Sequence, residues 1–130
     1  RTLRQRSCID QGLHSPYAVI ALASWERIFS DLEATLNDHR KWIIGDAFSL
    51  ADLNFAPFIA RLEAINYLRL WLDTRPKTSA WWTRLKARSS YIQAGVGPAA
   101  DEEKNFSEEG RKNVTEVRHI LKTLILKGPI

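Results

Sequence analysis

The sequence contains no methionine and only one cysteine among its 130 residues. A single cysteine cannot form an internal disulfide, so Cys8 excludes a disulfide-stapled fold and indicates a protein of the reducing cytoplasm. No stretch approaches the roughly 18 uninterrupted apolar residues of a membrane-spanning helix, and no apolar segment follows the basic N-terminus as in a signal peptide. Because the chain begins at Arg1 and lacks methionine, we expect either a piece of a longer protein or a chain whose methionines have been dropped.

The excess of positive charge is also small. Nineteen lysines and arginines against fifteen acidic residues give a net charge of +4, which is dispersed except at Arg1, Arg4 and Arg6. A nucleic-acid-binding protein usually concentrates its charge on one face, with motif residues to match, so we expect no nucleic-acid partner and no membrane partner. Binding of an acidic partner through the basic N-terminus is a minor alternative.

Residues that could carry chemistry lack the partners that the chemistry needs. The three histidines, His14, His39 and His119, show neither i, i+4 spacing nor a neighbouring cluster of cysteines or carboxylates, so we expect no metal site. Ser7 and Cys8 have no identifiable base, and a Ser49–Asp52 pair lacks a histidine. The sequence therefore predicts no catalytic residue within this chain.

Helical periodicity is present instead, and no run alternates as a half-buried strand does. Apolar residues recur at helical spacing over 24–39, and residues 1–23 suggest a first helix bent near Ser15 and Pro16. Shorter helices are expected over 76–88 and from Ser89 to Gly95 or Gly97. The pattern predicts an all-α bundle of five to seven helices.

The C-terminal part divides into a loop and a helix. Residues 97–112 are charged and poor in apolar side chains, so we expect an irregular loop there. Asn113 followed by Glu116 is typical of a capping box and predicts a C-terminal helix over about 113–127.

The strongest local signal lies between Trp42 and Leu68. Ser49 occupies an N-cap position, and the Asp52 carboxylate three residues later can reach back to the Ser49 N–H. Phe48 before the cap and Leu53 after it are placed to form a hydrophobic staple. The helix that follows is apolar on nearly all sides, which is typical of a central, buried helix. It contains Pro57, which removes one hydrogen bond at a cost of around 3 kcal/mol.

Four segments carry a resemblance to a known family. W-I-I-G-D-A-F-S-L-A-D (42–52) resembles the signature of the C-terminal domain of cytosolic glutathione transferases, in which the Ser and Asp form the capping box of a buried helix. The segment R-P-K-T-S-A-W-W-T-R-L-K-A-R-S-S-Y-I-Q-A (75–94) is similar to the next element of that family, except that Ser90 stands where the family usually has proline. The flanks, 6–24 and 108–121, resemble the bacterial glutathione-dependent β-aryl etherases and their dehalogenase-like relatives.

The resemblance implies one glutathione transferase C-terminal-like domain over 1–130. The family's thioredoxin-like N-terminal domain, which supplies the thiol-activating residue, is absent from this chain. The relatives also place more residues between their first two long helices than lie around Ala23–Trp25. Either a short hairpin lies there or a segment is absent from the sequence.

The function that the resemblance implies is that of a helical substrate-pocket and dimerisation domain. The parent enzyme would use glutathione as co-substrate to conjugate or cleave hydrophobic small-molecule electrophiles, whereas the chain alone would bind none and be inactive. A homodimer would form through the first two long helices. Tyr17 and Trp25 are the candidates for lining the substrate pocket, and the alternative for both is a role as ordinary core aromatics. The alternative function is a non-catalytic interaction module of the same fold, as in domains attached to translation factors and synthetases.

Overall fold

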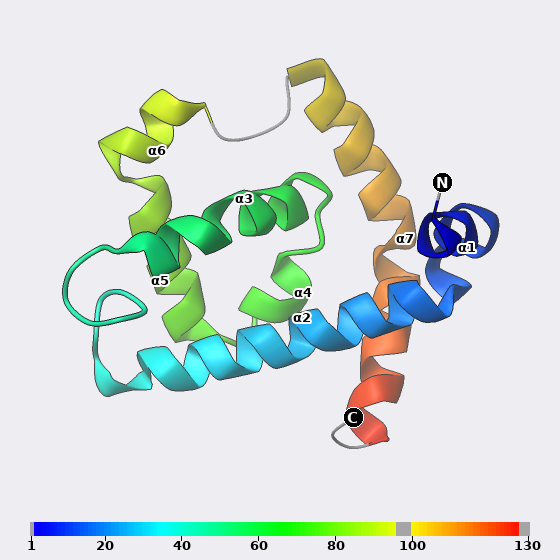
Figure 1. Ribbon diagram of the computed structural model, residues 1–130, viewed down its shortest axis with the longest axis horizontal. Helices are drawn as coiled ribbons and strands as arrows, with labels where there is room; N and C mark the ends of the chain where they lie inside the picture. The colour runs from blue at the N-terminus through cyan, green and yellow to red at the C-terminus, as the bar shows by residue number, and fades with distance from the viewer. Residues whose placement is uncertain (1, 96–99, 128–130) are drawn as a thin grey trace.

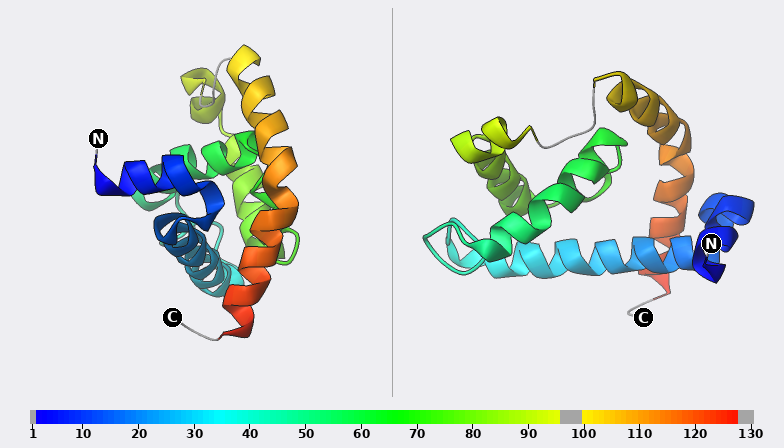
Figure 2. Two further views of the ribbon diagram at one scale, coloured as in Figure 1. Left: turned by 90° about the vertical axis from the view of Figure 1, so that its right-hand side faces the viewer. Right: turned by 45° about the horizontal axis from the view of Figure 1, so that its top comes forward.

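The computed structural model describes residues 2–95 and 100–127, and the secondary structure in this part of the chain is helical, with no strand (Figures 1 and 2). The all-α prediction is thus confirmed. The α-helices are α1 (Leu3–Gln11), α2 (Pro16–Thr35), α3 (Leu50–Ala64), α4 (Arg69–Leu72), α5 (Pro76–Lys86), α6 (Ser89–Ala94) and α7 (Ala100–Leu126), with 3₁₀ turns at Gly12–His14 and Leu36–Asp38. None of the described helices has the length and apolarity needed to cross a membrane.

Helix α2 corrects the expected boundary near residue 24. It runs without a break from Pro16 to Thr35, so the hairpin considered at Ala23–Trp25 is not there. Ser15 starts the helix, because its hydroxyl accepts a hydrogen bond from the Tyr17 N–H at 3.3 Å, and Pro16 occupies the first helical position. The bend expected near Ser15 and Pro16 is instead a break between two helices. Helix α1 ends at Gln11, and Gly12, which follows it, has a φ of +56°.

Helix α7 corrects the expected C-terminal loop. The prediction of a loop over 97–112 is wrong for residues 100–112, which are helical, and residues 97–99 lie outside the described part. Asn113 is inside the helix and donates its side-chain amide to the Glu109 carbonyl, so it is not an N-cap. The segment is rich in lysine and glutamate, which favour helices. The side of α7 that faces the rest of the domain includes Phe106, Gly110, Val117 and Leu121.

Helix α7 is fixed across the C-terminal end of α3. Asn66 closes α3 in the left-handed region (φ +62°), and its side-chain amide donates to the Ser107 carbonyl at 2.9 Å and to the Ser107 hydroxyl at 2.6 Å. The Arg61 guanidinium lies 4.3 Å from the centre of the Phe106 ring. Gly110 is buried against α3, and a Cβ atom there would lie 1.6 Å from the Ile65 carbonyl oxygen.

The core forms where α2, α3, α4 and α5 meet. Trp71 of α4 stacks on Phe29 of α2 with ring centres 5.3 Å apart, and Trp25 continues the stack at 5.6 Å from Phe29. Figure 1 shows α3 at the centre, with α2 running below it and α7 to its right. The expectation that α3 is buried on all sides is wrong, because Leu50, Leu53 and Phe58 are exposed.

Replacing Gly110 by alanine tests the contact between α7 and α3. In an ordinary helix this change stabilises by about 0.5–1 kcal/mol, because alanine has the higher helix propensity. Here the added methyl overlaps the Ile65 carbonyl, so we expect a destabilisation of about 1–3 kcal/mol in urea unfolding. Gly45→Ala is the control, since open space surrounds that position. A Gly110→Ala protein more stable than the wild type would contradict the close contact.

Candidate functional site

The N-terminus of α3 is held by a reciprocal pair of hydrogen bonds. The Ser49 hydroxyl accepts from the Ala51 N–H at 3.3 Å, and Asp52 Oδ2 accepts from the Ser49 N–H at 3.0 Å. Sequence reasoning located both residues, because Ser-x-x-Asp before an apolar helix is a local pattern.

Asp52 also connects α3 to two distant parts of the chain. Its other oxygen, Oδ1, accepts from the Ile43 N–H at 3.0 Å and from the Trp81 indole N–H at 2.8 Å. The Asp52 side chain is fully buried, at 0% exposure. A buried carboxylate is tolerated only when donors surround it, and here they come from the 39–48 loop, the N-cap and α5. The bonds from Ile43 and Trp81 could not be predicted from the sequence, because these residues lie nine and 29 positions from Asp52 and no local pattern pairs them with it.

The aromatic residues beside the cap hold the loop to Arg88, which lies between α5 and α6. Phe48 packs edge-on against Trp42 at 5.1 Å, and the Arg88 guanidinium lies 3.8 Å from the centre of the Phe48 ring. Leu53 is 51% exposed, so the staple between Phe48 and Leu53 stays a prediction.

A second carboxylate caps α5 from another helix. Glu33 of α2 accepts from the Lys77 N–H at 3.0 Å, and from the N–H and the hydroxyl of Thr78, both at 2.7 Å. Burial acts to raise the pKa of Glu33, but the hydrogen bonds from Thr78 and Lys77 outweigh it and lower the pKa below its ordinary value. Sequence reasoning missed this cap, because the residue before Pro76 is Arg75, whose side chain does not cap α5.

Arg75 strengthens the same contact. Its guanidinium donates to Glu26 and Ser30 of α2 and to the Trp71 carbonyl. Charged hydrogen bonds therefore attach the junction between α4 and α5 to α2. The stack of Trp25, Phe29 and Trp71 joins α2 to α4 as well.

The structure does not bring Tyr17 and Trp25 together. Both lie on α2, eight residues apart, which separates them by about 12 Å along the helix axis. Trp25 stacks on Phe29 at the edge of the core. Tyr17 lies on the first turn of α2, half-buried, with the Arg4 guanidinium 5.7 Å from the centre of its ring. Of the two candidates, Tyr17 is thus the one outside the core stack.

Helix α7 packs against α2 at a corner near the N-terminal end of α2, which α1 also joins. The His14 imidazole contacts the Glu116 carboxylate at 2.9 Å, and in Figure 1 α1 lies beside α7 at the end of α2. Burial raises the pKa of Tyr67, and the charge of Glu116 raises it further. Near this corner the Cys8 thiol donates to the buried Ser15 hydroxyl at 3.7 Å. Cys8 therefore helps to pack α1 against the start of α2.

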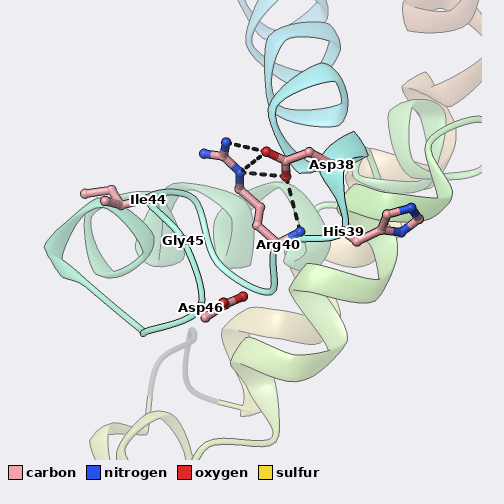
Figure 3. A pocket seen from close by; sticks show the side chains of 6 residues that line it. All are labelled: Asp38, His39, Arg40, Ile44, Gly45 and Asp46. Carbon is pink, nitrogen blue, oxygen red and sulfur yellow. Dashed lines mark hydrogen bonds and ion pairs between the residues drawn. The ribbon is translucent and has the colours of Figure 1, made fainter.

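A polar hollow of about 430 Å³ lies at the opposite end of α2 (Figure 3). Its lining is Asp38, His39, Arg40, Ile44, Gly45 and Asp46. Figure 3 shows the Arg40 guanidinium paired with Asp38, and these hydrogen bonds hold the pKa of Asp38 at about 2. The hollow contains neither Tyr17 nor Trp25. Among the described residues no group of three or more histidine, cysteine, aspartate or glutamate side chains could hold a metal ion.

Comparison with known proteins identifies the domain. The family model "Glutathione S-transferase, C-terminal domain" matches residues 10–89, which include the capped start of α3 and all of α5. The chain belongs to this family. The match ends before α7, so the long final helix is described by the structure alone.

The related proteins of known activity include two bacterial dehalogenases and a plant transferase. The chain is 34% identical to a tetrachloro-p-hydroquinone reductive dehalogenase of Sphingobium chlorophenolicum, over 56% of this chain and 29% of that protein. It is 32% identical to a 2,5-dichlorohydroquinone reductive dechlorinase of Sphingobium indicum, over 72% and 28%. It is 36% identical to glutathione S-transferase 2 of Triticum aestivum, over 62% and 28%. The chain thus spans less than a third of the length of these relatives, and no solved structure matches it.

We expect the two capping residues of α3 to differ in their effect on stability. Ser49→Ala removes the cap bond from the Ala51 N–H and the bond from the Ser49 hydroxyl to Asp52, and should cost about 1 kcal/mol. Asp52→Ala also leaves the Ile43 N–H and the Trp81 indole without an acceptor, so it should cost about 3 kcal/mol or more. Urea unfolding measures both, with exposed Asp46→Ala as the control. Equal costs for Ser49→Ala and Asp52→Ala would show that the bonds to Ile43 and Trp81 add nothing.

Glu33 should make the free energy of unfolding depend on pH in the acid range. Because its pKa is lowered by folding, its contribution is present above its ordinary pKa of 4.5 and is lost as the pH falls through the lower folded value. The free energy of unfolding should therefore fall from about pH 5 downward, and Glu33→Gln should make that fall shallower. Exposed Glu108→Gln should leave the slope as in the wild type, and an unchanged slope for Glu33→Gln would contradict the role of this carboxylate.

Proposed function

We propose that this chain is the helical substrate-binding domain of a glutathione transferase-type enzyme. The single observation that carries the proposal is the corner where α7 packs against α2, with Glu116 of α7 beside His14, just before α2 begins. In the family that the chain belongs to, the first helices of the domain and its tail line the site of the hydrophobic substrate. In this reaction the thiolate of glutathione attacks an electrophilic atom, the bond to the leaving group breaks, and the leaving group departs with the electron pair.

The proposed substrate is a flat, aromatic electrophile with a halogen or ether leaving group. The two bacterial relatives are dehalogenases of chlorinated hydroquinones, which supports an aromatic substrate. Tyr17 offers a ring face against which such a molecule can stack, and the Arg4 guanidinium lies over the same ring. Trp25 is the weaker pocket candidate, because its ring is already stacked on Phe29.

The co-substrate of the proposed enzyme is glutathione, bound and activated by a thioredoxin-like domain. This chain would position the electrophile, and we assign none of its residues to thiol activation. We also propose a cytoplasmic location, in keeping with the single half-buried Cys8.

A homodimer through α1 and α2 is a further part of the proposal. The two long helices predicted for this role are one continuous α2 preceded by the short α1. Helix α1 has no buried residue and exposes Leu3 and Ile9, and α2 exposes Ile20. A nine-residue helix with no buried side chain is marginal by itself, which favours cover by a partner subunit.

Steady-state kinetics of the natively expressed protein test the proposed function. With glutathione and a chlorinated nitrobenzene, Tyr17→Ala should raise the KM for the aromatic substrate about threefold to tenfold, the equivalent of ~0.5–1.5 kcal/mol of aromatic stacking. Tyr17→Phe keeps the ring and should leave the KM unchanged. The 130-residue chain alone should show no turnover. Turnover by the chain alone would contradict the proposal, and a native protein without glutathione-dependent activity would favour the non-catalytic interaction module.

A further inference from the structure

Two arginines at the end of α5 lie against the same part of the 39–48 loop. The Arg84 Nη2 group donates to the Lys41 carbonyl at 2.9 Å, and the Arg88 guanidinium lies 5.5 Å from the centre of the Trp42 ring. Lys41 and Trp42 are neighbours in the chain, so their Cα atoms are about 3.8 Å apart. Two guanidinium groups therefore meet at one place, where the loop approaches the junction of α5 and α6.

Both arginines carry a buried donor that has no acceptor. Among the described residues three buried side-chain nitrogens lack a hydrogen-bond partner, and two of them are Arg84 Nε and Arg88 Nε. The third, Trp71 Nε1, belongs to an indole that is fully buried in the core. Such atoms are rare, because an unmade hydrogen bond at a buried N–H is costly, and a bound ion is one of their causes. Two of them on neighbouring guanidinium groups indicate one shared acceptor.

The positive charge of the two arginines is not balanced nearby. Within the part of the chain that the structure describes neither of them forms an ion pair, whereas Lys86 between them is paired with Glu63. Asp46, the acidic residue of the loop, lines the polar hollow together with Arg40. Like charges about one helical turn apart repel each other, and an anion bound between them removes that repulsion. The charge pattern therefore favours an anionic ligand.

The loop beside the arginines is fixed in place. The Trp42 N–H donates to the Gly45 carbonyl at 2.9 Å, and the Ile43 N–H donates to the buried Asp52 carboxylate at 3.0 Å. A preorganised site loses little conformational entropy when it binds a ligand. The position of the two guanidinium groups is therefore set by the same hydrogen bonds that hold the start of α3.

A solute can approach the arginines from outside. The Arg88 guanidinium lies 3.8 Å from the centre of the Phe48 ring, and a stacked guanidinium keeps its N–H edges for an anion. Arg84 and Arg88 are half-buried, and Ser89 and Ser90, which follow them, are exposed. The two hydroxyls add donors next to Arg88 in the chain.

We propose that Arg84 and Arg88 form a binding site for the phosphoryl group of a small molecule. Arginine presents its N–H groups as a planar fork that matches phosphate oxygens in pairs. Within the described residues only the Arg84 Nη2 group has an acceptor, the Lys41 carbonyl. Two adjacent positive charges match a doubly charged phosphoryl group better than the single charge of a carboxylate. A small rotation of each guanidinium toward the anion gives both buried Nε–H groups an acceptor.

This site is separate from the corner of the proposed function. Figure 1 shows α6 and the 39–48 loop on the left of the molecule, and α1 and α7 on the right. Binding at the arginines does not require glutathione or an aromatic substrate. Because the anion joins the loop to α5, its binding should stabilise the folded protein.

NMR of the natively expressed protein with ¹⁵N-labelled arginine tests the site. As inorganic phosphate is added at constant ionic strength, the guanidinium resonances of Arg84 and Arg88 should move and reach a plateau. Exposed Arg69, which is paired with Asp73, is the control and should not move. The unfolding temperature should rise by about 4–7 °C at a phosphate concentration about ten times the Kd. The absence of a saturable shift at Arg84 and Arg88 would overturn the site.

Matched variants locate the binding. Arg84→Gln and Arg88→Gln each remove one fork and should weaken the Kd for phosphate about tenfold or more. Arg88→Lys keeps the positive charge over Phe48 but loses the fork, so it should weaken the Kd about threefold to tenfold. Arg69→Gln should leave the Kd unchanged. Folded Arg84→Gln and Arg88→Gln proteins that bind phosphate as tightly as the wild type would overturn the site.

Titrations with other anions test the class of ligand. Glycerol phosphate that binds as tightly as inorganic phosphate would support an organic phosphate ester, and much tighter binding of inorganic phosphate would support the free anion as the ligand. Acetate that binds as tightly as phosphate would overturn the phosphoryl group in favour of a carboxylate. Equal shifts at Arg69 and Arg84, abolished by sodium chloride, would overturn the site in favour of general charge screening.

Discussion

The buried carboxylate of Asp52 is the interaction on which the rest of this domain depends. Four hydrogen bonds reach it, from the N–H and the hydroxyl of Ser49, the Ile43 N–H and the Trp81 indole. They join the 39–48 loop, the start of α3 and the middle of α5 at one point inside the core. Because an unpaired buried carboxylate is costly, these donors have to be in place together, which fixes the relative position of the three segments.

The remaining contacts extend from this centre. Glu33 and Arg75 attach the start of α5 to α2, so the indole that reaches Asp52 is also positioned by α2. Asn66 and Gly110 attach α7 to the far end of α3. The corner where α7 packs against α2 is therefore set by the same framework.

Local patterns in the sequence were enough to predict local structure, but they could not predict contacts between residues that are distant in the sequence. Ser49 and Asp52 stand three residues apart, so their cap could be predicted, as could the all-helical class and the family. The bonds from Asp52 to Trp81 and from Glu33 to Thr78 join residues far apart in sequence, which no periodicity records. Helix α7 was missed over 100–112 because the segment is charged and poor in apolar side chains, and its closest contact with α3 is made by Gly110, which has no side chain. The burial of α3 was overestimated because its composition shows only that the helix is apolar on nearly all sides. It does not show whether residues of this chain pack against each side, and Leu50, Leu53 and Phe58 are exposed.

A double-mutant cycle between Asp52 and Trp81 tests the central claim most directly. The free energy of unfolding in urea is measured for the wild type, Asp52→Ala, Trp81→Phe and the double variant. The cycle removes the cost of the smaller ring and isolates the bond between the two side chains. We predict a coupling of about 1 kcal/mol or more, as for a buried hydrogen bond to a charged group. Effects that add to within about 0.5 kcal/mol would show that Asp52 and Trp81 act independently, and would contradict a fold centred on this carboxylate.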